Sequence, residues 1–309
     1  MRYYFAPLEG ITGYIFRNAH KRYFSGVDKY FAPFISTNQN HAFSNKEMRD
    51  ILPENNEGVS LVPQLLGKVA VDFISAAKVL EDMGYSEVNL NLGCPSGTVA
   101  AKGKGSGALA DTDKLSSFLE EIFQGTNIKI SIKTRLGIKE PEEFGDILEI
   151  FNRYPVSELI IHPRVQRDFY KNTVNLDAFE KALSASANPV CYNGDINTPD
   201  DCSKVLERFP KTQSIMIGRG LVSDPALAQK LCGGSDGDKN VLQAFHDEIY
   251  STYRQVFRND RNAIMRMKEF WSLFMEQFNC GEKQAKKMRK VTSAGDYEAL
   301  AAEIFSNLQ

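Results

Sequence analysis

Residues 89–95 read NLNLGCP, an apolar strand that ends in one cysteine held between a glycine and a proline. Glycine permits a tight turn and a close approach of a ligand to the backbone. Proline fixes its own φ angle and removes a hydrogen-bond donor. We therefore expect the Cys94 thiol to lie on a stiff corner at a strand end, where it can face a ligand. A basic, glycine-rich loop, KGKGSG at residues 102–107, follows and is suited to an anionic partner.

Short apolar runs of this kind recur along the chain and alternate with amphipathic stretches. The runs cover residues 3–6, 30–35, 61–66, 88–92, 128–133, 159–162, 190–192 and 214–217. The helical candidates between them cover residues 71–83, 114–123, 142–151, 176–183, 199–209 and 225–231. Strands that alternate with helices predict a parallel sheet. Eight such units in about 230 residues fit an α/β fold of the closed (β/α)₈ TIM-barrel type, with an open doubly wound sheet as the alternative.

A flexible polar break, GGSDGD at residues 233–238, follows the eighth unit. Beyond it the sequence is helical in character and contains no strand candidate and no proline. We predict a barrel domain that carries catalysis over residues 1–232 and a small all-helical domain over residues 240–309. In the second domain, Phe270, Trp271 and Phe274 are expected to form the core.

Composition narrows the class of protein. No apolar run approaches the roughly 18 residues of a membrane span, and the N-terminus, MRYYFAP, does not resemble a secretory signal, so we expect a cytoplasmic protein without a membrane anchor. The five cysteines form no C-x-x-C pair and the four histidines show no ligand spacing, so neither a metal site nor a disulfide is expected. A net charge of −2 excludes a strongly basic nucleic-acid binder, and any RNA contact must come from local faces.

Polar residues follow the predicted strands at their carboxyl ends, where a barrel carries its active site. The strand ends supply Glu9, Gln64, Asn91, Cys94, Lys133, Arg135, His162, Arg164, the turn NGD at 193–195 and the turn GRG at 218–220. Loops after strands seven and eight often bind phosphate. Either turn alone could be an ordinary βα turn, but the pair predicts a phosphorylated cofactor. Lys133 needs a negative partner in a barrel mouth; a reduced flavin would serve, and an ion pair with Glu9 or Asp195 is the alternative.

Taken together, these motifs resemble those of the tRNA-dihydrouridine synthases, flavoenzymes with a barrel and a helical domain. The resemblance covers nearly the whole chain. It rests on the ordered set APLEG (6–10), QLLG (64–67), NLGCP (91–95), KTRLG (133–137), NGD (193–195) and GRG (218–220). It implies an enzyme that reduces a uridine in tRNA with FMN as cofactor and NADPH as reductant.

The resemblance also implies a role for each matching residue. The isoalloxazine ring would be lined by Pro7, Leu8, Glu9 and Gln64, with its polar edge held by Lys133 and His162. The ribityl phosphate would be bound by Asn193, Gly194, Asp195, Gly218 and Arg219. The target uracil would be oriented by Asn91 and Arg135. Hydride would pass from flavin N5 to uracil C6, and Cys94 would donate the proton to C5 as a general acid, since a cysteine thiol is ordinarily protonated at neutral pH.

The sequence departs from the family pattern in three places. Asn89 stands where an aspartate is usual, and Pro163 stiffens a turn that is more commonly His-Gly-Arg. Lys102 and Lys104 make the loop after Cys94 more basic than in many relatives, and we expect both to contact RNA.

Two basic runs in residues 240–309 are further candidates for RNA contact. Arg254, Arg258 and Arg261 have the spacing of one helical face, as do Lys283, Lys287 and Lys290, with Lys286 and Arg289 adjacent. The alternative is a solvated charged face. Transfer RNA is the expected partner, with ribosomal RNA as the alternative, and we expect a monomer. Two rivals stay open: an FMN barrel oxidoreductase acting on a small molecule, and an RNA-binding protein without catalysis.

Overall fold

Ten parallel strands form one sheet in the computed structural model, which describes residues 1–39, 43–278 and 282–306. The strands are β1 Arg2–Phe5, β2 Lys29–Phe31, β3 Ile35–Ser36, β4 Leu61–Val62, β5 Gln64–Leu66, β6 Glu87–Leu92, β7 Lys129–Arg135, β8 Leu159–His162, β9 Val190–Asn193 and β10 Ser214–Ile217. Strand β1 pairs with both β2 and β10, and the order from β5 to β10 follows the chain.

The ring of strands is closed. Strand β2 pairs with β4, β3 pairs with β5, and β4 and β5 are two halves of one extended segment separated by Pro63. Proline has no N–H to donate to a sheet, so Pro33 and Pro63 each divide a predicted run in two. Tyr30 lies opposite Leu61 but Ile35 opposite Leu65, a one-residue slip of the kind a β-bulge produces. The predicted eight-unit barrel is confirmed, and the open sheet is excluded.

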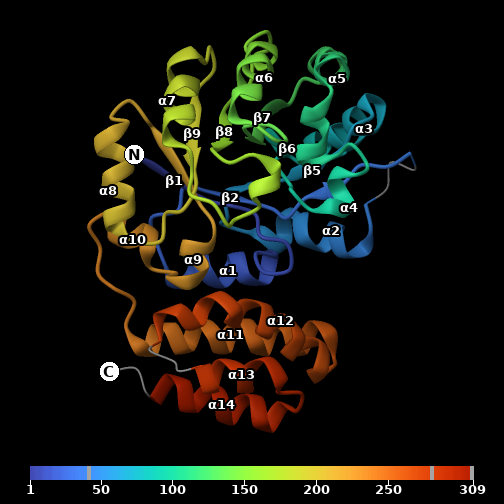
Figure 1. The fold of residues 1–309 in the computed structure, drawn as a ribbon. Coiled ribbons are helices and arrows are strands. Elements are labelled where there is room, and N and C mark those ends of the chain that lie inside the picture. The colour runs from blue at the N-terminus through green and yellow to red at the C-terminus, as the bar shows by residue number, and fades with distance from the viewer. Residues whose placement is uncertain (40–42, 279–281, 307–309) are drawn as a thin grey trace.

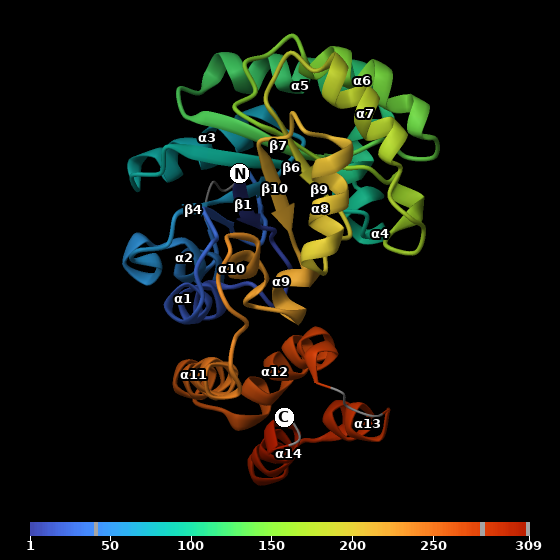
Figure 2. The same cartoon turned by 90° about the vertical axis from the view of Figure 1, so that its left-hand side faces the viewer.

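Helices surround the barrel, and a further group of helices lies beside it (Figures 1 and 2). The helices of the barrel part are α1 Tyr14–Tyr23, α2 Asn45–Ile51, α3 Ala70–Asp82, α4 Gly97–Ala100, α5 Thr112–Gly125, α6 Phe144–Phe151, α7 Leu176–Ala185, α8 Pro199–Arg208, α9 Arg219–Ser223 and α10 Leu227–Leu231. The C-terminal helices are α11 Lys239–Phe257, α12 Asp260–Phe274, α13 Glu282–Lys290 and α14 Ala294–Ser306.

The strands divide their side chains between two environments because successive residues of a strand point to opposite faces. In β6, Val88, Leu90 and Leu92 belong to the large apolar core shared with the helices. Asn89 and Asn91 alternate with them and bond to neighbouring strands inside the barrel. The rest of the barrel interior is largely apolar, filled by Tyr4, Ala6, Phe31, Val62, Ile160, Cys191 and Met216.

The C-terminal helices pack on the barrel through α1 and α9 (Figure 2). The ring of Phe245 in α11 meets the rings of Phe16 and Phe24 edge-on, with centroids 5.5 and 5.2 Å apart. Ser223 Oγ, at the end of α9, donates to Glu276 Oε2 at 2.8 Å. As predicted, Phe270, Trp271 and Phe274 are buried core residues, and Trp271 Nε1 donates to the Tyr297 hydroxyl at 2.9 Å.

The prediction that three arginines share one helical face is wrong. Helix α11 ends at Phe257, Arg258 takes a left-handed conformation with φ of 50°, and α12 starts at Asp260. Arg254 lies before this break and Arg261 after it, so the helical spacing does not apply to them. Arg254 is also held in ion pairs to two acidic side chains, Asp260 at 2.7 Å and Glu298 at 3.1 Å.

The lysine run, in contrast, lies within a single helix. Lys283, Lys287 and Lys290 belong to α13, whose buried residue is Met288. Lys287 approaches Glu303 at 3.7 Å. Helix α13 therefore presents a predominantly basic exposed surface.

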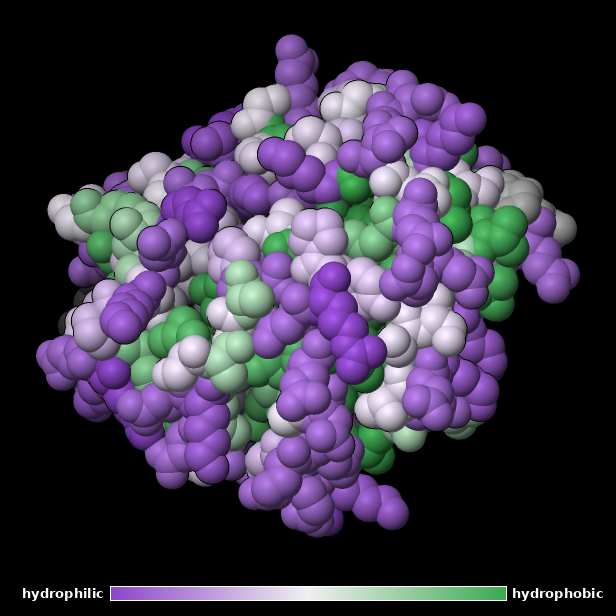
Figure 3. All heavy atoms as spheres, turned by 90° about the horizontal axis from the view of Figure 1, so that it is seen from above, coloured by the Kyte–Doolittle hydropathy of each residue, from purple (hydrophilic) through white to green (hydrophobic). Residues whose placement is uncertain are grey.

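The face of the molecule turned away from the C-terminal helices is mainly hydrophilic, with apolar side chains scattered between polar ones (Figure 3). None of the helices within residues 1–39, 43–278 and 282–306 has the length and apolar character needed to cross a membrane. Over the same residues, no three His, Cys, Asp or Glu side chains are grouped so that they could hold a metal ion. The sequence predicts that the cysteines and histidines form no metal site. Two of these residues, His41 and Cys280, lie outside the described residues.

Candidate active site

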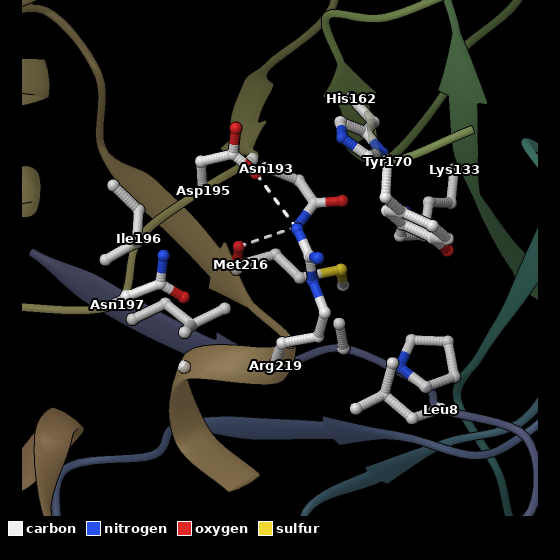
Figure 4. A pocket seen from close by; sticks show the side chains of 16 residues that line it. Leu8, Lys133, His162, Tyr170, Asn193, Asp195, Ile196, Asn197, Met216 and Arg219 are labelled. Atoms are coloured by element: carbon white, nitrogen blue, oxygen red, sulfur yellow. Dashed lines mark hydrogen bonds and ion pairs between the residues drawn. The ribbon is translucent and has the colours of Figure 1, made fainter. Parts of the chain in front are cut away.

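A pocket opens at the carboxyl ends of β1, β7, β8, β9 and β10 (Figure 4). Parallel strands end at one edge of a barrel, so side chains far apart in the sequence meet there. The pocket is lined by Ala6, Pro7, Leu8, Lys133, His162, Tyr170, Asn193, Gly194, Asp195, Ile196, Asn197, Met216, Ile217, Gly218, Arg219 and Gly220. Nine of the predicted cofactor residues are in this set.

Asp195 organises one side of the pocket. Its carboxylate accepts hydrogen bonds from Arg164, including one at 2.9 Å from Nη1, and from Arg219 Nη2 at 3.1 Å. Asp195 has a positive φ of 43°, and the preceding Gly194 has φ of 154°, a conformation open to glycine. Figure 4 shows the Arg219 side chain reaching across the pocket. One carboxylate here faces two guanidinium groups, so the site keeps a net positive charge.

His162 is a neutral hydrogen-bond acceptor in this setting. Burial, followed by the positive charges of Lys133 and its arginine neighbours, lowers the pKa of His162 well below its usual 6.5. Arg164 Nη1 donates to His162 Nε2 at 3.0 Å. Because Nε2 accepts, the imidazole proton of the neutral ring is on Nδ1.

The Lys133 ammonium has no ion-pair partner among the described residues. The two carboxylates that could have paired with it are engaged elsewhere, Glu9 with Lys46 at 3.2 Å and Asp195 with the arginines. The ion-pair alternative for Lys133 is therefore excluded. Burial, with repulsion from Arg135 in second place, lowers the pKa of Lys133 from 10.5 to about 8. An unpaired ammonium that lines a pocket is suited to an anionic ligand.

Cys94 lies on the stiff turn that its neighbours predict. The Asn91 Oδ1 atom accepts the backbone N–H groups of Gly93 at 3.0 Å and Cys94 at 2.9 Å. The Cys94 carbonyl accepts from Ser106, from the backbone N–H at 3.1 Å and from Oγ at 2.8 Å. Gly105 has φ of 57°, and a Cβ there would lie 2.9 Å from that carbonyl, so glycine allows the loop to fold back on the turn. The partly exposed thiol is thus carried by a backbone held on both sides.

Arg135 joins the Cys94 turn to the loop after β8. Its Nε donates to the Gly93 carbonyl at 3.0 Å, and its two terminal nitrogens donate to the carbonyls of Val165 at 3.0 Å and Phe169 at 2.7 Å. The side chain is fully buried. In this structure the guanidinium therefore orders two active-site loops, whereas its predicted contact with the uracil stays a prediction.

Tyr170 closes one side of the pocket and was missed from the sequence. Its ring is close to two guanidinium groups, 5.3 Å from that of Arg135 and 4.9 Å from that of Arg219, and lies 6.0 Å from the His162 ring. The preceding Phe169 has φ of 50°, which is rare for a bulky residue and marks a strained loop. Both aromatic side chains are about half exposed. The sequence signal that could have identified Tyr170 was the aromatic pair Phe169-Tyr170 in the loop after the strand that ends at His162.

A family model described as dihydrouridine synthase (Dus) matches residues 4–307. The chain belongs to the dihydrouridine synthase family. Among its relatives is the tRNA-dihydrouridine(16) synthase of Pseudomonas putida, 26% identical over 287 residues, which are 88% of each chain. A probable tRNA-dihydrouridine synthase of Staphylococcus aureus is 28% identical over 305 residues, covering 96% of this chain and 91% of the relative.

Solved structures of two other proteins share the fold of this dihydrouridine synthase family member. Morphinone reductase superposes with a TM-score of 0.55 at 11% identity, over 77% of this chain and 87% of its own. A variant of NCR from Zymomonas mobilis gives a TM-score of 0.56 at 12% identity, over 79% of this chain and 90% of its own. At these identities the likeness concerns the fold alone.

Seven of the residues predicted to belong to the dihydrouridine synthase site are not among those that line the pocket: Glu9, Gln64, Asn91, Cys94, Lys102, Lys104 and Arg135. Glu9 is exposed and lines a neighbouring cavity of about 720 Å³ between the barrel loops and helices α11 and α12. Gln64 is fully buried inside the barrel. Lys102 is exposed on the loop after Cys94. Lys104 Nζ donates to the Thr37 carbonyl at 3.2 Å, so this lysine joins two loops.

Proposed function

We propose that this protein reduces a specific uridine in tRNA to 5,6-dihydrouridine, with FMN as cofactor and NADPH as reductant. The observation that carries the proposal is the unpaired Lys133 ammonium at the mouth of the barrel, in a pocket with an excess of positive charge. Membership of the dihydrouridine synthase family and the names of the relatives, which specify tRNA, support the reaction and the substrate.

The residues of the pocket fit FMN. The turns at 193–195 and 218–220 meet on one side of the pocket and offer backbone N–H groups and the Arg219 guanidinium to a phosphate. A Cβ on Gly220 would lie 2.1 Å from the Ile196 carbonyl, so glycine lets these two turns pack together. Pro7 and Leu8 give an apolar wall for the isoalloxazine ring, and Lys133 would face its polar edge.

Bound FMN would supply the hydride that uracil C6 receives, and NADPH would restore it. The protein supplies position and a proton. Cys94 Sγ would donate that proton to uracil C5, and the hydrogen bonds that join the Cys94 backbone to Asn91 and Ser106 fix the turn that carries the thiol. His162 Nδ1, which carries the imidazole proton, would be available to donate a hydrogen bond to the bound cofactor.

Folded RNA must release a base from its stack to reach such a pocket. We propose that residues 240–309 form a separate RNA-binding domain beside the barrel domain of residues 1–232. Lysines of α13 and the exposed Lys102 would contact phosphates, which supply most of the affinity for RNA. We expect a monomer, since a large folded RNA must reach the barrel mouth. We also expect the protein to act in the cytoplasm.

Reconstitution with unmodified tRNA tests the proposal. The purified protein should show the absorbance of oxidised flavin, and with NADPH it should form dihydrouridine in the tRNA, detected by mass spectrometry. Protein that contains no flavin and binds none would refute the cofactor. If NADPH reduces the flavin but no dihydrouridine forms in tRNA, the reaction on tRNA is refuted. If dihydrouridine forms only in ribosomal RNA, ribosomal RNA is the substrate instead of tRNA.

A further inference from the structure

A chain of hydrogen-bonded polar side chains runs through the barrel interior and ends at the Cys94 turn. The Cys94 backbone N–H donates to Asn91 Oδ1 at 2.9 Å, and Asn91 Nδ2 donates to Gln64 Oε1 at 2.7 Å. Gln64 Nε2 donates to Asn89 Oδ1 at 2.7 Å, and Asn89 Nδ2 donates to Ser131 Oγ at 2.9 Å. We call the four side chains Gln64, Asn89, Asn91 and Ser131 the amide chain.

The direction of every bond in the amide chain is determined at its Cys94 end. Two backbone N–H groups, of Gly93 and Cys94, point at Asn91, and only its amide oxygen can accept them. The Asn91 nitrogen must then face Gln64, which has to present its oxygen and turn its nitrogen inward. Position 89 must therefore provide an acceptor. An amide in the opposite orientation would place two donors or two acceptors face to face.

The amide chain crosses from β5 through β6 to β7 inside the barrel. Gln64, Asn89 and Ser131 have no exposed surface, and Asn91 is 7% exposed. Barrel interiors are usually filled by branched apolar side chains, and a buried donor that loses its acceptor is costly because water cannot replace the bond. If the hydrogen bonds of Asn89 or Ser131 were lost, Gln64 and Asn91 would therefore have to reorient to find new partners. The nearest partner is solvent at the Cys94 turn, so the turn itself would be disturbed.

We propose that Asn89 and Ser131 are positioning residues, which act through Gln64 and Asn91 to fix the turn that carries the Cys94 thiol. Neither residue lines the pocket. The inference rests on the proposed function for what the thiol does, whereas the geometry it predicts can be measured without any substrate.

Three substitutions separate this role from a general loss of packing. Asn89→Leu has a similar size but offers no acceptor to Gln64. Asn89→Asp keeps that acceptor, and its second oxygen can accept the Ser131 hydroxyl hydrogen. Ser131→Ala breaks the bond furthest from the turn. The matched control is Ser214→Ala, since Ser214 is equally buried in β10 but donates to Glu158 at 2.6 Å, outside the amide chain.

Hydrogen exchange at the backbone amides of Gly93 and Cys94, measured by NMR on the full-length protein without added FMN, tests the proposal. We expect Asn89→Leu to accelerate exchange at both amides by about tenfold or more, and Ser131→Ala by a few-fold. Asn89→Asp and Ser214→Ala should stay within about twofold of wild type. With FMN, NADPH and tRNA, kcat should fall in the same order, with KM for tRNA unchanged and Asn89→Asp active.

Wild-type exchange in Asn89→Leu, or equal acceleration in Ser214→Ala, would overturn the proposal. If Asn89→Leu does not fold, exchange at the Gly93 and Cys94 amides is compared between Ser131→Ala and Ser214→Ala. Faster exchange in Ser131→Ala alone supports the proposal, and equal rates in the two variants overturn it. Absence of dihydrouridine from the wild-type reaction would refute the proposed function instead, and the exchange rates would still test the positioning role.

Discussion

Replacement of Lys133 by methionine should stabilise the protein in the absence of FMN while weakening its hold on FMN. Methionine has a similar length and no charge, so it removes the cost of an unpaired ammonium at the barrel mouth. The pKa of Lys133 is lowered from 10.5 to about 8 by burial and then by Arg135. At about 1.4 kcal/mol per pH unit, this difference corresponds to roughly 3 kcal/mol.

The pH dependence gives the prediction its sign. Between pH 8 and 10.5 the folded protein binds fewer protons at Lys133 than the unfolded chain does. The Lys133 contribution to the free energy of unfolding therefore rises with pH across this window. The full penalty is present below about pH 8 and is gone above 10.5, where the lysine is neutral in both states. The advantage of Lys133→Met should follow the penalty: large at pH 7 and absent near pH 10.5.

Urea denaturation of FMN-free wild type and Lys133→Met at several pH values measures this difference, with Lys78→Met, an exposed position on α3, as control. Flavin fluorescence gives FMN affinity, which should fall about tenfold or more because a charge-assisted bond is lost. A methionine variant that is less stable than wild type at pH 7 would show that the ammonium has a stabilising partner. A gain that does not change with pH would refute the attribution to charge.

Three further predictions concern the thiol, the pocket carboxylate and helix α13. Cys94→Ala should keep FMN and NADPH oxidation but lose about 100-fold or more in uridine reduction, the usual effect of removing a general acid; normal turnover on tRNA would remove Cys94 from that role. Asp195→Asn should lower the free energy of unfolding by about 2 kcal/mol, because Arg164 is buried and loses its charged acceptor; unchanged denaturation would contradict this pairing. Replacing Lys283, Lys287 and Lys290 by alanine should weaken tRNA binding and reduce its salt dependence by about one unit of log–log slope per lost phosphate contact, and an unchanged slope in filter binding would show that α13 does not contact RNA.

The barrel and most of its pocket could be predicted from the sequence because each strand is a short apolar run with a polar residue at its end. Lys133, His162 and Asn193 are such residues, and all three line the pocket. Tyr170 and Asn197 come from loops whose path depends on tertiary contacts, so their place could not be predicted. Gln64 also lies at a strand end, but the sequence gave no indication that other side chains bury it completely.

One interpretation failed for a reason of local geometry. The arginine spacing in 254–261 is helical, but Arg258 takes a left-handed conformation and Asn259 Oδ1 caps the next helix by accepting the Asn262 N–H at 3.1 Å. The asparagine before Asp260 was the sequence signal for that helix start. The protein contacts of Arg135 could not be predicted either, because the carbonyls that accept from its guanidinium come from two loops whose paths depend on tertiary contacts.

The central claim is that the Cys94 corner and the cationic pocket together reduce a uridine in tRNA. Mapping dihydrouridine in tRNA from cells without this gene, and from the same cells complemented with wild type or Cys94→Ala, tests it most directly. We predict that a tRNA position loses dihydrouridine in the deletion strain, regains it with wild type and does not regain it with Cys94→Ala. Unchanged dihydrouridine at every tRNA position in the deletion strain would contradict the account.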